Sequence, residues 1–126
     1  MNMDKQAIKT KWLEELRNGG HKQVQGTLKG IESDGTIGYC CLGVLEEKVL
    51  GNQVDAVKIV AIDEDIHHII GYEGPTITYD RLKEDIIGNL ELTDELMDMN
   101  DTGWSFVQIA NYIEREWNPD QEETAE

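Results

Sequence analysis

The chain has 126 residues and a formal net charge of −15. A chain of this length fits one domain that buries roughly two thirds of its unfolded surface. It contains no apolar run of about 18 residues, so we expect no membrane-spanning helix. Met1–Lys5 lack the apolar stretch of a signal peptide, and we therefore expect a protein of the cytoplasm of the cell that makes it.

The negative charge lies in the second half of the chain. Residues 1–59 hold eight Lys/Arg and eight Asp/Glu, which cancel, whereas residues 60–126 hold three Lys/Arg and eighteen Asp/Glu. Nucleic-acid binding needs basic side chains that neutralise phosphates. Because the second half has so few of them, we predict no direct contact with nucleic acid.

The first predicted element is a helix over residues 4–17. Asp4 is suited to cap its start, and Gly19 and Gly20 favour its end. Apolar side chains recur at every fourth position: Ile8, Trp12 and Leu16. This spacing predicts a helix with one face against the core.

A β-hairpin is predicted next, with strands over residues 24–31 and 36–39. The Asp34-Gly35 pair lies between the two segments. An Asp-Gly pair favours a tight turn because Gly adopts left-handed backbone angles without steric cost. The two strands should therefore pair in antiparallel fashion.

The apolar segment Cys40–Leu50 predicts a buried helix that ends at Gly51. Gly43 inside this helix is unfavourable by about 1 kcal/mol relative to Ala, so we expect another element to pack closely against it. Cys40 and Cys41 are the two cysteines of the chain, and adjacent cysteines cannot easily form a disulfide. We interpret both as reduced, buried side chains.

The middle of the chain predicts two strands and a helical turn. The strands are expected over residues 57–62 and 76–79, where β-branched and aromatic residues gather. The helical turn runs from Leu82 and ends at Gly88. The interval between the two strands carries no clear periodicity.

Two helices are predicted near the C-terminus. Thr93 is the expected N-cap of the first, and Ser105 with Gln108 forms a capping box for the second. Residues 118–126 are polar and acidic and are expected to be disordered. Together the elements predict one α+β domain over residues 1–117, with a small antiparallel sheet packed against three or four helices.

Three blocks of residues carry a family resemblance. They are Trp12-Leu13 with Leu16-Arg17, Gly20, Lys22-Gln23, Gly26 and Leu28; Tyr39-Cys40-Cys41-Leu42-Gly43-Val44-Leu45; and Met99-Asn100-Asp101-Thr102-Gly103 with Ser105-Phe106, Ile109-Ala110 and Ile113-Glu114. In these blocks the chain resembles a family of small phage and prophage accessory proteins of unassigned function. The resemblance implies an early or accessory phage gene product and supplies no known active site.

The chain departs from that family at two positions. Glu46 stands where similar proteins often carry a third cysteine, and Val24 stands where they tend to have glycine. A metal or redox task of the third cysteine in relatives would therefore be lost here. A packing role for Cys40 and Cys41 is compatible with both departures.

No motif singles out an active site. A small enzyme that uses Cys40 or Cys41 as nucleophile is an alternative, but no triad pattern accompanies the thiols. The residues that a metal site would use are Asp63, Asp65, His67 and His68, together with the cysteines. These lack the ligand spacing of a zinc site, and we predict neither a metal nor a cofactor.

The favoured hypothesis is a non-enzymatic protein that binds and modulates a host macromolecule, such as a defence or nucleic-acid-handling protein. Carboxylates held on two capped helices would meet a host protein with a basic surface. The candidate contact residues are Asp94, Glu95, Asp98, Asp101, Glu114 and Glu116. The alternative explanation of the same charge is solubility.

A rival hypothesis is a protein that sequesters a nucleotide-like signalling molecule. Aromatic rings would stack on the base, and basic side chains would meet the phosphates. The candidate residues are Trp12, His21, Lys22, Lys29 and Tyr39, all in the first half, whose net charge is zero. A homo-oligomer with Trp117 in its interface is a further hypothesis.

Overall fold

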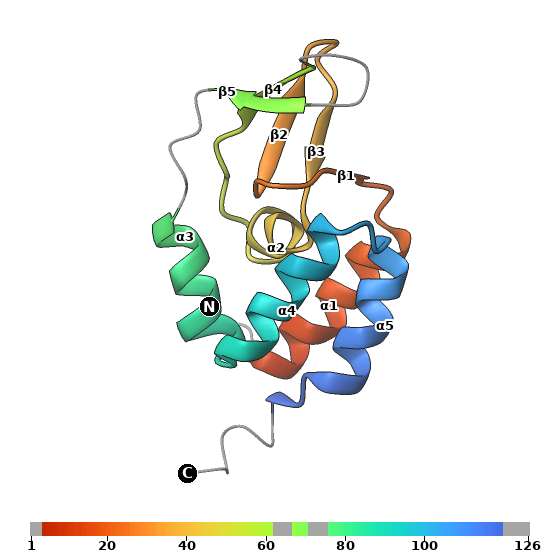
Figure 1. The fold of residues 1–126 in the computed structure, drawn as a ribbon. Helices are drawn as coiled ribbons and strands as arrows, with labels where there is room; N and C mark the ends of the chain where they lie inside the picture. The colour runs from red at the N-terminus through yellow and green to blue at the C-terminus, as the bar shows by residue number, and fades with distance from the viewer. Residues whose placement is uncertain (1–3, 62–66, 71–75, 120–126) are drawn as a thin grey trace.

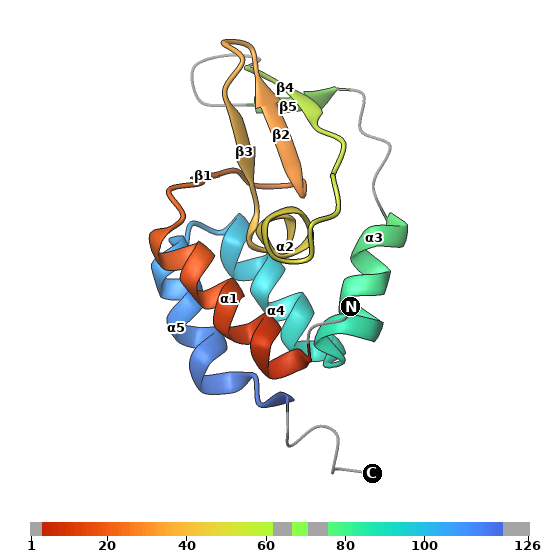
Figure 2. The same ribbon diagram turned by 180° about the vertical axis from the view of Figure 1, so that it is seen from behind.

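Helices form one side of the molecule and a sheet the other, with α2 between them (Figure 1, Figure 2). The structure, a computed structural model, describes residues 4–61, 67–70 and 76–119. The predicted tail over residues 118–126 lies outside them from residue 120 onwards. The helices are α1 (Lys5–Asn18), α2 (Cys41–Gly43) continuing as π-helix η1 (Val44–Val49), α3 (Thr76–Arg81) continuing as π-helix η2 (Leu82–Ile87), α4 (Leu90–Asp101) and α5 (Phe106–Glu116). In this part of the chain, none of the helices has the length and apolar character that crossing a membrane requires.

The sheet is mixed, and with the helices it confirms the predicted α+β class. Its strands are β1 (Lys22–Gln23), β2 (Lys29–Glu32), β3 (Ile37–Tyr39), β4 (Val57–Ala61) and β5 (His67–Ile70), in the spatial order β1-β3-β2-β4-β5. The expected antiparallel pairing holds for β2–β3 and β4–β5, whereas β1–β3 and β2–β4 are parallel. Strands β2 and β4 run in the same direction because both enter the sheet from its helical end (Figure 1).

The predicted hairpin turn is present between β2 and β3. The N–H of Glu32 donates to the Thr36 carbonyl at 2.9 Å, and Asp34 Oδ1 accepts the Thr36 N–H at 2.9 Å. Gly35 has a φ of +90°, which an Asp-Gly turn requires. The first strand was predicted from residue 24 but begins at Lys29, because the preceding residues form a loop held by other segments.

Two predictions of local structure were wrong. Residues 76–79 begin α3 instead of forming a strand. Helix α4 begins three residues before Thr93, because Asn89 caps it by accepting the Leu92 N–H at 3.0 Å. The Thr93 hydroxyl lies inside the helix and donates to the Asn89 carbonyl. The predicted capping box of Ser105 and Gln108 at the start of α5 is confirmed.

The core lies where α1, η1, α4 and α5 meet below the sheet. Trp12 and Trp117 are both fully buried, and their rings pack edge to face at a centroid distance of 5.9 Å. Each indole N–H has a partner: Trp12 donates to the Cys41 carbonyl and Trp117 to the Ile87 carbonyl. The hypothesis that Trp117 lies in a dimer interface was therefore wrong, because its ring is enclosed within the chain.

Asn100 joins α4, α2 and the loop after β1. Its side chain is fully buried at the C-terminal end of α4. Its Oδ1 accepts the Cys41 N–H at 3.2 Å and the Gln23 side-chain amide at 2.9 Å. Its Nδ2 donates to the Val24 carbonyl at 2.8 Å. One amide thus satisfies polar groups from two separate segments, α2 and the end of β1 with the loop that follows it.

We predict that Asn100→Ala lowers the free energy of unfolding by about 3 kcal/mol or more. The substitution leaves the Cys41 N–H and the Val24 carbonyl without a partner in the interior, and each unsatisfied group costs about 1–3 kcal/mol. Urea unfolding followed by circular dichroism measures the change. Gln25→Ala is the control, because Gln25 is an exposed amide in the same loop and its loss should stay within about 0.5 kcal/mol. Equal effects of the two variants would contradict the role of Asn100.

We also predict that Gly43→Ala destabilises the protein, although Ala favours an isolated helix by about 1 kcal/mol. A Cβ at this position would overlap the main-chain carbonyl of Leu28, as the close packing predicted for Gly43 requires. The expected loss is about 1–3 kcal/mol in urea unfolding, typical of overpacking. Lys11→Ala on the exposed side of α1 serves as the control. A stabilised Gly43→Ala variant would show that the contact relaxes freely.

Candidate functional site

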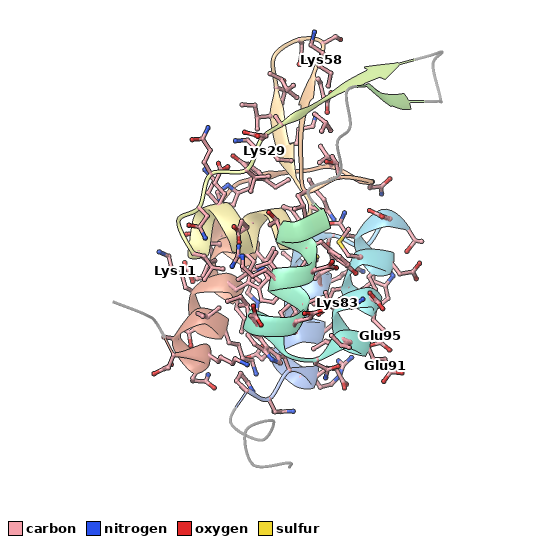
Figure 3. The ribbon with its side chains drawn as sticks, turned by 90° about the vertical axis from the view of Figure 1, so that its left-hand side faces the viewer. Lys11, Lys29, Lys58, Lys83, Glu91 and Glu95 are labelled. Carbon is pink, nitrogen blue, oxygen red and sulfur yellow. The ribbon has the colours of Figure 1, made fainter. Side chains whose placement is uncertain are left out.

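One side of α4 carries five exposed carboxylates. The side chains of Leu92, Leu96 and Met99 are buried, so the opposite side of the helix faces outward. Figure 3 shows Glu91 and Glu95 on the outer side of the helix. We call the following set the α4 acidic face: Glu91, Asp94, Glu95, Asp98 and Asp101.

Neutral donors hold three of these carboxylates in place. Asp94 accepts the Tyr79 hydroxyl at 2.6 Å and Glu95 accepts the Tyr112 hydroxyl at 2.9 Å. Asp101 Oδ1 accepts the Gly26 N–H at 2.9 Å. Asp94 also pairs with Lys83 at 3.0 Å. The Tyr79 hydrogen bond, followed by that from Lys83, lowers the pKa of Asp94 below its ordinary value, so its carboxyl group stays ionised.

Two members of the face keep their carboxylates available. Among the described residues, no hydrogen bond or ion pair engages the carboxylates of Glu91 and Asp98. The sequence prediction included Asp98 but missed Glu91, because it placed the start of the helix after that residue. The Asn89 N-cap is the signal that would have found it, since Glu91 then falls four and seven residues before Glu95 and Asp98 on one helix side.

The two predicted carboxylates of α5 are already paired with arginines. Glu114 pairs with Arg17 of α1 at 2.6 Å, and this hydrogen bond lowers the pKa of Glu114. Glu116 pairs with its neighbour Arg115 at 3.0 Å. Both charges are partly neutralised within the chain. The structure therefore gathers four of the six predicted contact residues on one helix and separates Glu114 from them by turning it toward α1.

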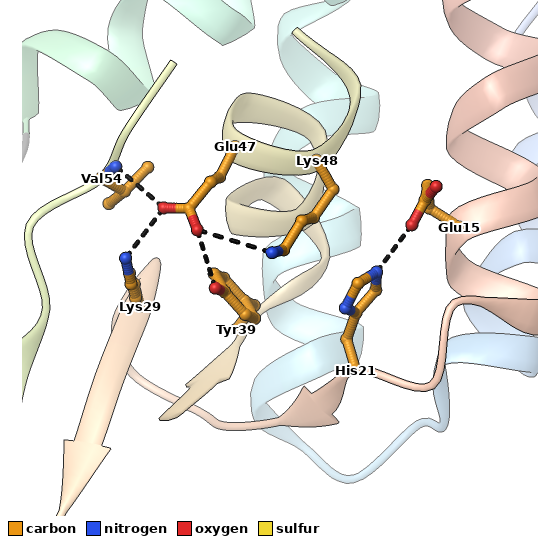
Figure 4. Close-up of polar contacts among 7 residues, drawn as sticks. All are labelled: Glu15, His21, Lys29, Tyr39, Glu47, Lys48 and Val54. Carbon is orange, nitrogen blue, oxygen red and sulfur yellow. Dashed lines mark hydrogen bonds and ion pairs between the residues drawn. The ribbon is translucent and has the colours of Figure 1, made fainter. Parts of the chain in front are cut away.

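The residues of the predicted nucleotide site divide into two groups. Trp12 is fully buried in the core, and its ring is not available for stacking on a ligand. Lys22 pairs with Glu32 at 2.9 Å. The other three lie together between β2, β3 and η1, around the ring of Tyr39 (Figure 4): His21, Lys29 and Tyr39. The His21 ring lies edge-on to the Tyr39 ring at 5.9 Å and its Nε2 lies 2.7 Å from Glu15.

Glu47 of η1 lies at the centre of the group around Tyr39. Its carboxylate accepts the Lys29 ammonium at 2.9 Å, the Tyr39 hydroxyl at 2.8 Å and the Val54 N–H at 3.0 Å. Lys48 lies 3.7 Å from the same carboxylate. The two ammonium groups nearest Tyr39 therefore face a carboxylate of the chain itself. An anionic ligand would have to displace Glu47 to reach them.

The environment of Glu47 shifts two pKa values in opposite directions. Burial alone would raise the pKa of Glu47, but hydrogen bonds from Lys29, Val54 and Tyr39 lower it to about 2. Burial and the hydrogen bond to Glu47 raise the pKa of Tyr39 to about 12. Near neutral pH the cluster consists of an ionised carboxylate and a protonated phenol. It ties η1 to β2, β3 and the loop before β4.

Cys40 and Cys41 are both buried and free. Cys40 Sγ accepts the Gly43 N–H at 3.4 Å, as the N-cap of α2, and Cys41 Sγ lies 3.7 Å from the Leu96 carbonyl. Burial raises the pKa of Cys40 to about 12 and that of Cys41 well above its ordinary value. Both thiols are protonated at neutral pH, whereas a nucleophilic cysteine acts as a thiolate.

Glu46 and the candidate metal ligands are the remaining residues that the sequence analysis singled out. Glu46, at the position where similar phage proteins often have cysteine, is buried and forms a two-oxygen pair with Arg81. It therefore joins η1 to α3. Asp63 and Asp65 lie outside the described residues. In the part of the chain that the structure describes, no three His, Cys, Asp or Glu side chains lie close enough together to hold a metal ion.

We predict that the stabilising effect of Glu47 is lost in acid. Folding lowers its pKa from an ordinary value of 4.5 to about 2, so protonation favours the unfolded chain. The difference in free energy of unfolding between wild type and Glu47→Gln should be largest above pH 4.5 and shrink as the pH falls toward 2. Urea titrations across this range measure it. Glu14→Gln, at an exposed position of α1, should differ from wild type by a small amount throughout. A difference for Glu47→Gln that does not change with pH would contradict the assignment.

The comparisons with known proteins add a family model for part of the chain. A domain of unknown function, DUF8296, matches residues 3–63, which is just under half of the chain. The match runs from α1 to β4 and includes the double cysteine and Glu47, but not the α4 acidic face. No curated protein and no solved structure matches the chain. The chain is thus similar to DUF8296 in its first half.

Proposed function

We propose that the protein is a non-enzymatic accessory protein that binds and modulates a host protein with a basic surface through the α4 acidic face. A defence protein or a nucleic-acid-handling protein is the expected class of partner, since these have basic surfaces that bind phosphates. The observation that carries the proposal is the set of five exposed carboxylates on one helix, three of them held by hydrogen bonds and two without a partner among the described residues. The resemblance to phage accessory proteins is the reason for expecting a phage-encoded protein and a host partner.

The fixed carboxylates support a binding role for this surface over a role in solubility alone. A flexible acidic side chain loses rotamer freedom when it binds, whereas Asp94 and Glu95 are already oriented by the hydroxyls of Tyr79 and Tyr112. The donor to Glu95 is neutral, so this carboxylate keeps its charge, whereas Asp94 is also paired with Lys83. This arrangement favours recognition of defined positions on a partner over general hydration.

The charge of the second half also supports rapid association. A strongly negative surface steers a basic partner and raises association rates by 10 to roughly 1000-fold at low salt. The effect falls with ionic strength, because the Debye length shortens to about 8 Å at physiological salt. Binding through this face should therefore be strongly salt-dependent.

The sequestering of a nucleotide-like signal has weaker support. Lys29 and Lys48 lie against the carboxylate of Glu47, and Trp12 is buried in the core. Displacing an ionised Glu47 from two ammonium groups would offset much of the gain from binding phosphate. The acidic face requires no such rearrangement.

We predict that Glu91→Gln/Asp98→Asn weakens binding to the partner by roughly two- to thirtyfold. The double substitution removes two exposed charge pairs with the partner, and each contributes about 0.2–1 kcal/mol. The matched control is Glu14→Gln/Asp55→Asn, which removes the same charge from exposed positions of the first half. Tagged wild-type protein first captures the partner from infected host cells at low salt. Binding of the purified partner is then measured by biolayer interferometry over a salt series.

The proposal expects a stoichiometric basic protein that is retained by wild type and the control, is released by salt, and binds more weakly to the α4 variant. Equal weakening by both variants would show that only net charge matters. Recovery of a nucleotide without a stoichiometric protein would favour sequestering of a small molecule.

A further inference from the structure

Trp104 is the exposed member of the three tryptophans of the chain. The rings of Trp12 and Trp117 are fully buried, whereas 40% of Trp104 is exposed between α4 and α5. Its main chain is fixed, because its N–H donates to the Met99 carbonyl at 3.0 Å and its carbonyl accepts the Gln23 amide at 2.7 Å. The structure thus presents a large ring to solvent on main chain that is held by hydrogen bonds.

A second ring connects Trp104 to the α4 acidic face. The rings of Trp104 and Tyr112 meet edge to face at a centroid distance of 6.3 Å, and the Tyr112 hydroxyl donates to Glu95. Val107, on the first turn of α5, is 49% exposed. We call Trp104 and Tyr112 the Trp104 patch. The exposed Trp104 ring is thus linked to the α4 acidic face through Tyr112.

The chemistry of this combination fits a cationic side chain. Aromatic faces attract guanidinium and ammonium groups, and neighbouring carboxylates strengthen the attraction. The chain already contains one example, because the Arg115 guanidinium lies over the Tyr112 ring at 5.2 Å. In the described part of the chain, no Lys or Arg side chain lies over the Trp104 ring. Tyr112 therefore has its own cation, and Trp104 offers a face for another.

Charge also selects among the occupants of the patch. A second copy of this chain would bring two acidic faces together, and like charges at an interface cost several kcal/mol. A purely apolar segment would gain nothing from the carboxylates beside the rings. An arginine side chain uses both, since its planar guanidinium stacks on a ring while its N–H groups donate to carboxylates.

We infer that the Trp104 patch seats an arginine side chain of the basic partner, with the guanidinium against the Trp104 ring and directed to the carboxylates of the α4 acidic face. The inference rests on the proposed function, because it names the side chain that this face recognises. It adds a contact that depends on the ring and not on net charge. Ring and charge can therefore be tested separately.

The test uses the full chain and two fluorescein-labelled peptides, one of alternating arginine and glycine and one of alternating lysine and glycine. Fluorescence anisotropy measures affinity, and acrylamide quenching of tryptophan emission reports on Trp104, since the other two tryptophans are buried. We predict that Trp104→Leu weakens binding of the arginine peptide by about two- to fivefold and abolishes its advantage over the lysine peptide. Trp104→Tyr should restore most of the affinity, and Val107→Ala is the control at another exposed apolar position of α5. The arginine peptide should also protect wild-type emission from acrylamide.

The outcomes separate this inference from the proposed function. Salt-sensitive binding that falls in Glu91→Gln/Asp98→Asn but is unchanged in Trp104→Leu, with no protection from acrylamide, would overturn the inference alone. Absence of salt-sensitive binding by wild type would overturn the proposed function and the inference with it. Circular dichroism and the urea midpoint test whether Trp104→Leu is folded. We expect a folded variant, because the main-chain hydrogen bonds of residue 104 do not depend on its side chain.

Discussion

The hydrogen bonds of the Asn100 amide are the constraint on which the rest of the structure depends. A buried side-chain amide is tolerated only when its donors and acceptors are satisfied, and Asn100 meets that condition by binding Gln23, Val24 and Cys41 together. These hydrogen bonds set the position of α4 relative to α2 and the sheet. Asp101, the next residue, accepts the Gly26 N–H and holds the same loop from outside. Because α4 is fixed in rotation, its apolar residues face the core and its carboxylates face solvent.

Local sequence signals predicted the parts of the fold that short-range chemistry determines. The Asp34-Gly35 turn, the capping box at Ser105 and the close packing of Gly43 each follow from a residue and its immediate neighbours. Residues 76–79 have strand propensity, yet they form α3, whose end is bound to η1 by the pair of Arg81 with Glu46. That contact links positions 35 residues apart and has no local signal. The parallel pairing of β2 with β4 depends in the same way on where the intervening helix returns the chain.

The sequence predicted that the candidate site is acidic and named four of its five residues, but it did not give the complete set. Acid-rich periodicity identified Asp94, Glu95, Asp98 and Asp101, which do share α4. An N-cap assigned to Thr93 instead of Asn89 excluded Glu91, because the two positions compete locally and the core decides between them. Pairing across helices removed Glu114 from the set, since Arg17 is close in space and distant in sequence. Trp12 likewise reads as an aromatic that could bind a ligand until its burial against Trp117 is known.

The difference between Glu47 and the α4 acidic face is the reason for proposing that binding takes place on α4. Glu47 is surrounded by the ammonium groups of Lys29 and Lys48, which neutralise its charge and make it part of the framework. On α4, Glu95 and Asp101 receive hydrogen bonds from a hydroxyl and a main-chain N–H, which orient a carboxylate without removing its charge. Neutral donors thus leave a fixed negative potential outside the molecule. Cationic donors neutralise the carboxylate within the chain. A surface that is ordered and still charged is suited to a cationic partner, and the exposed ring of Trp104 beside it adds the geometric preference that charge alone lacks.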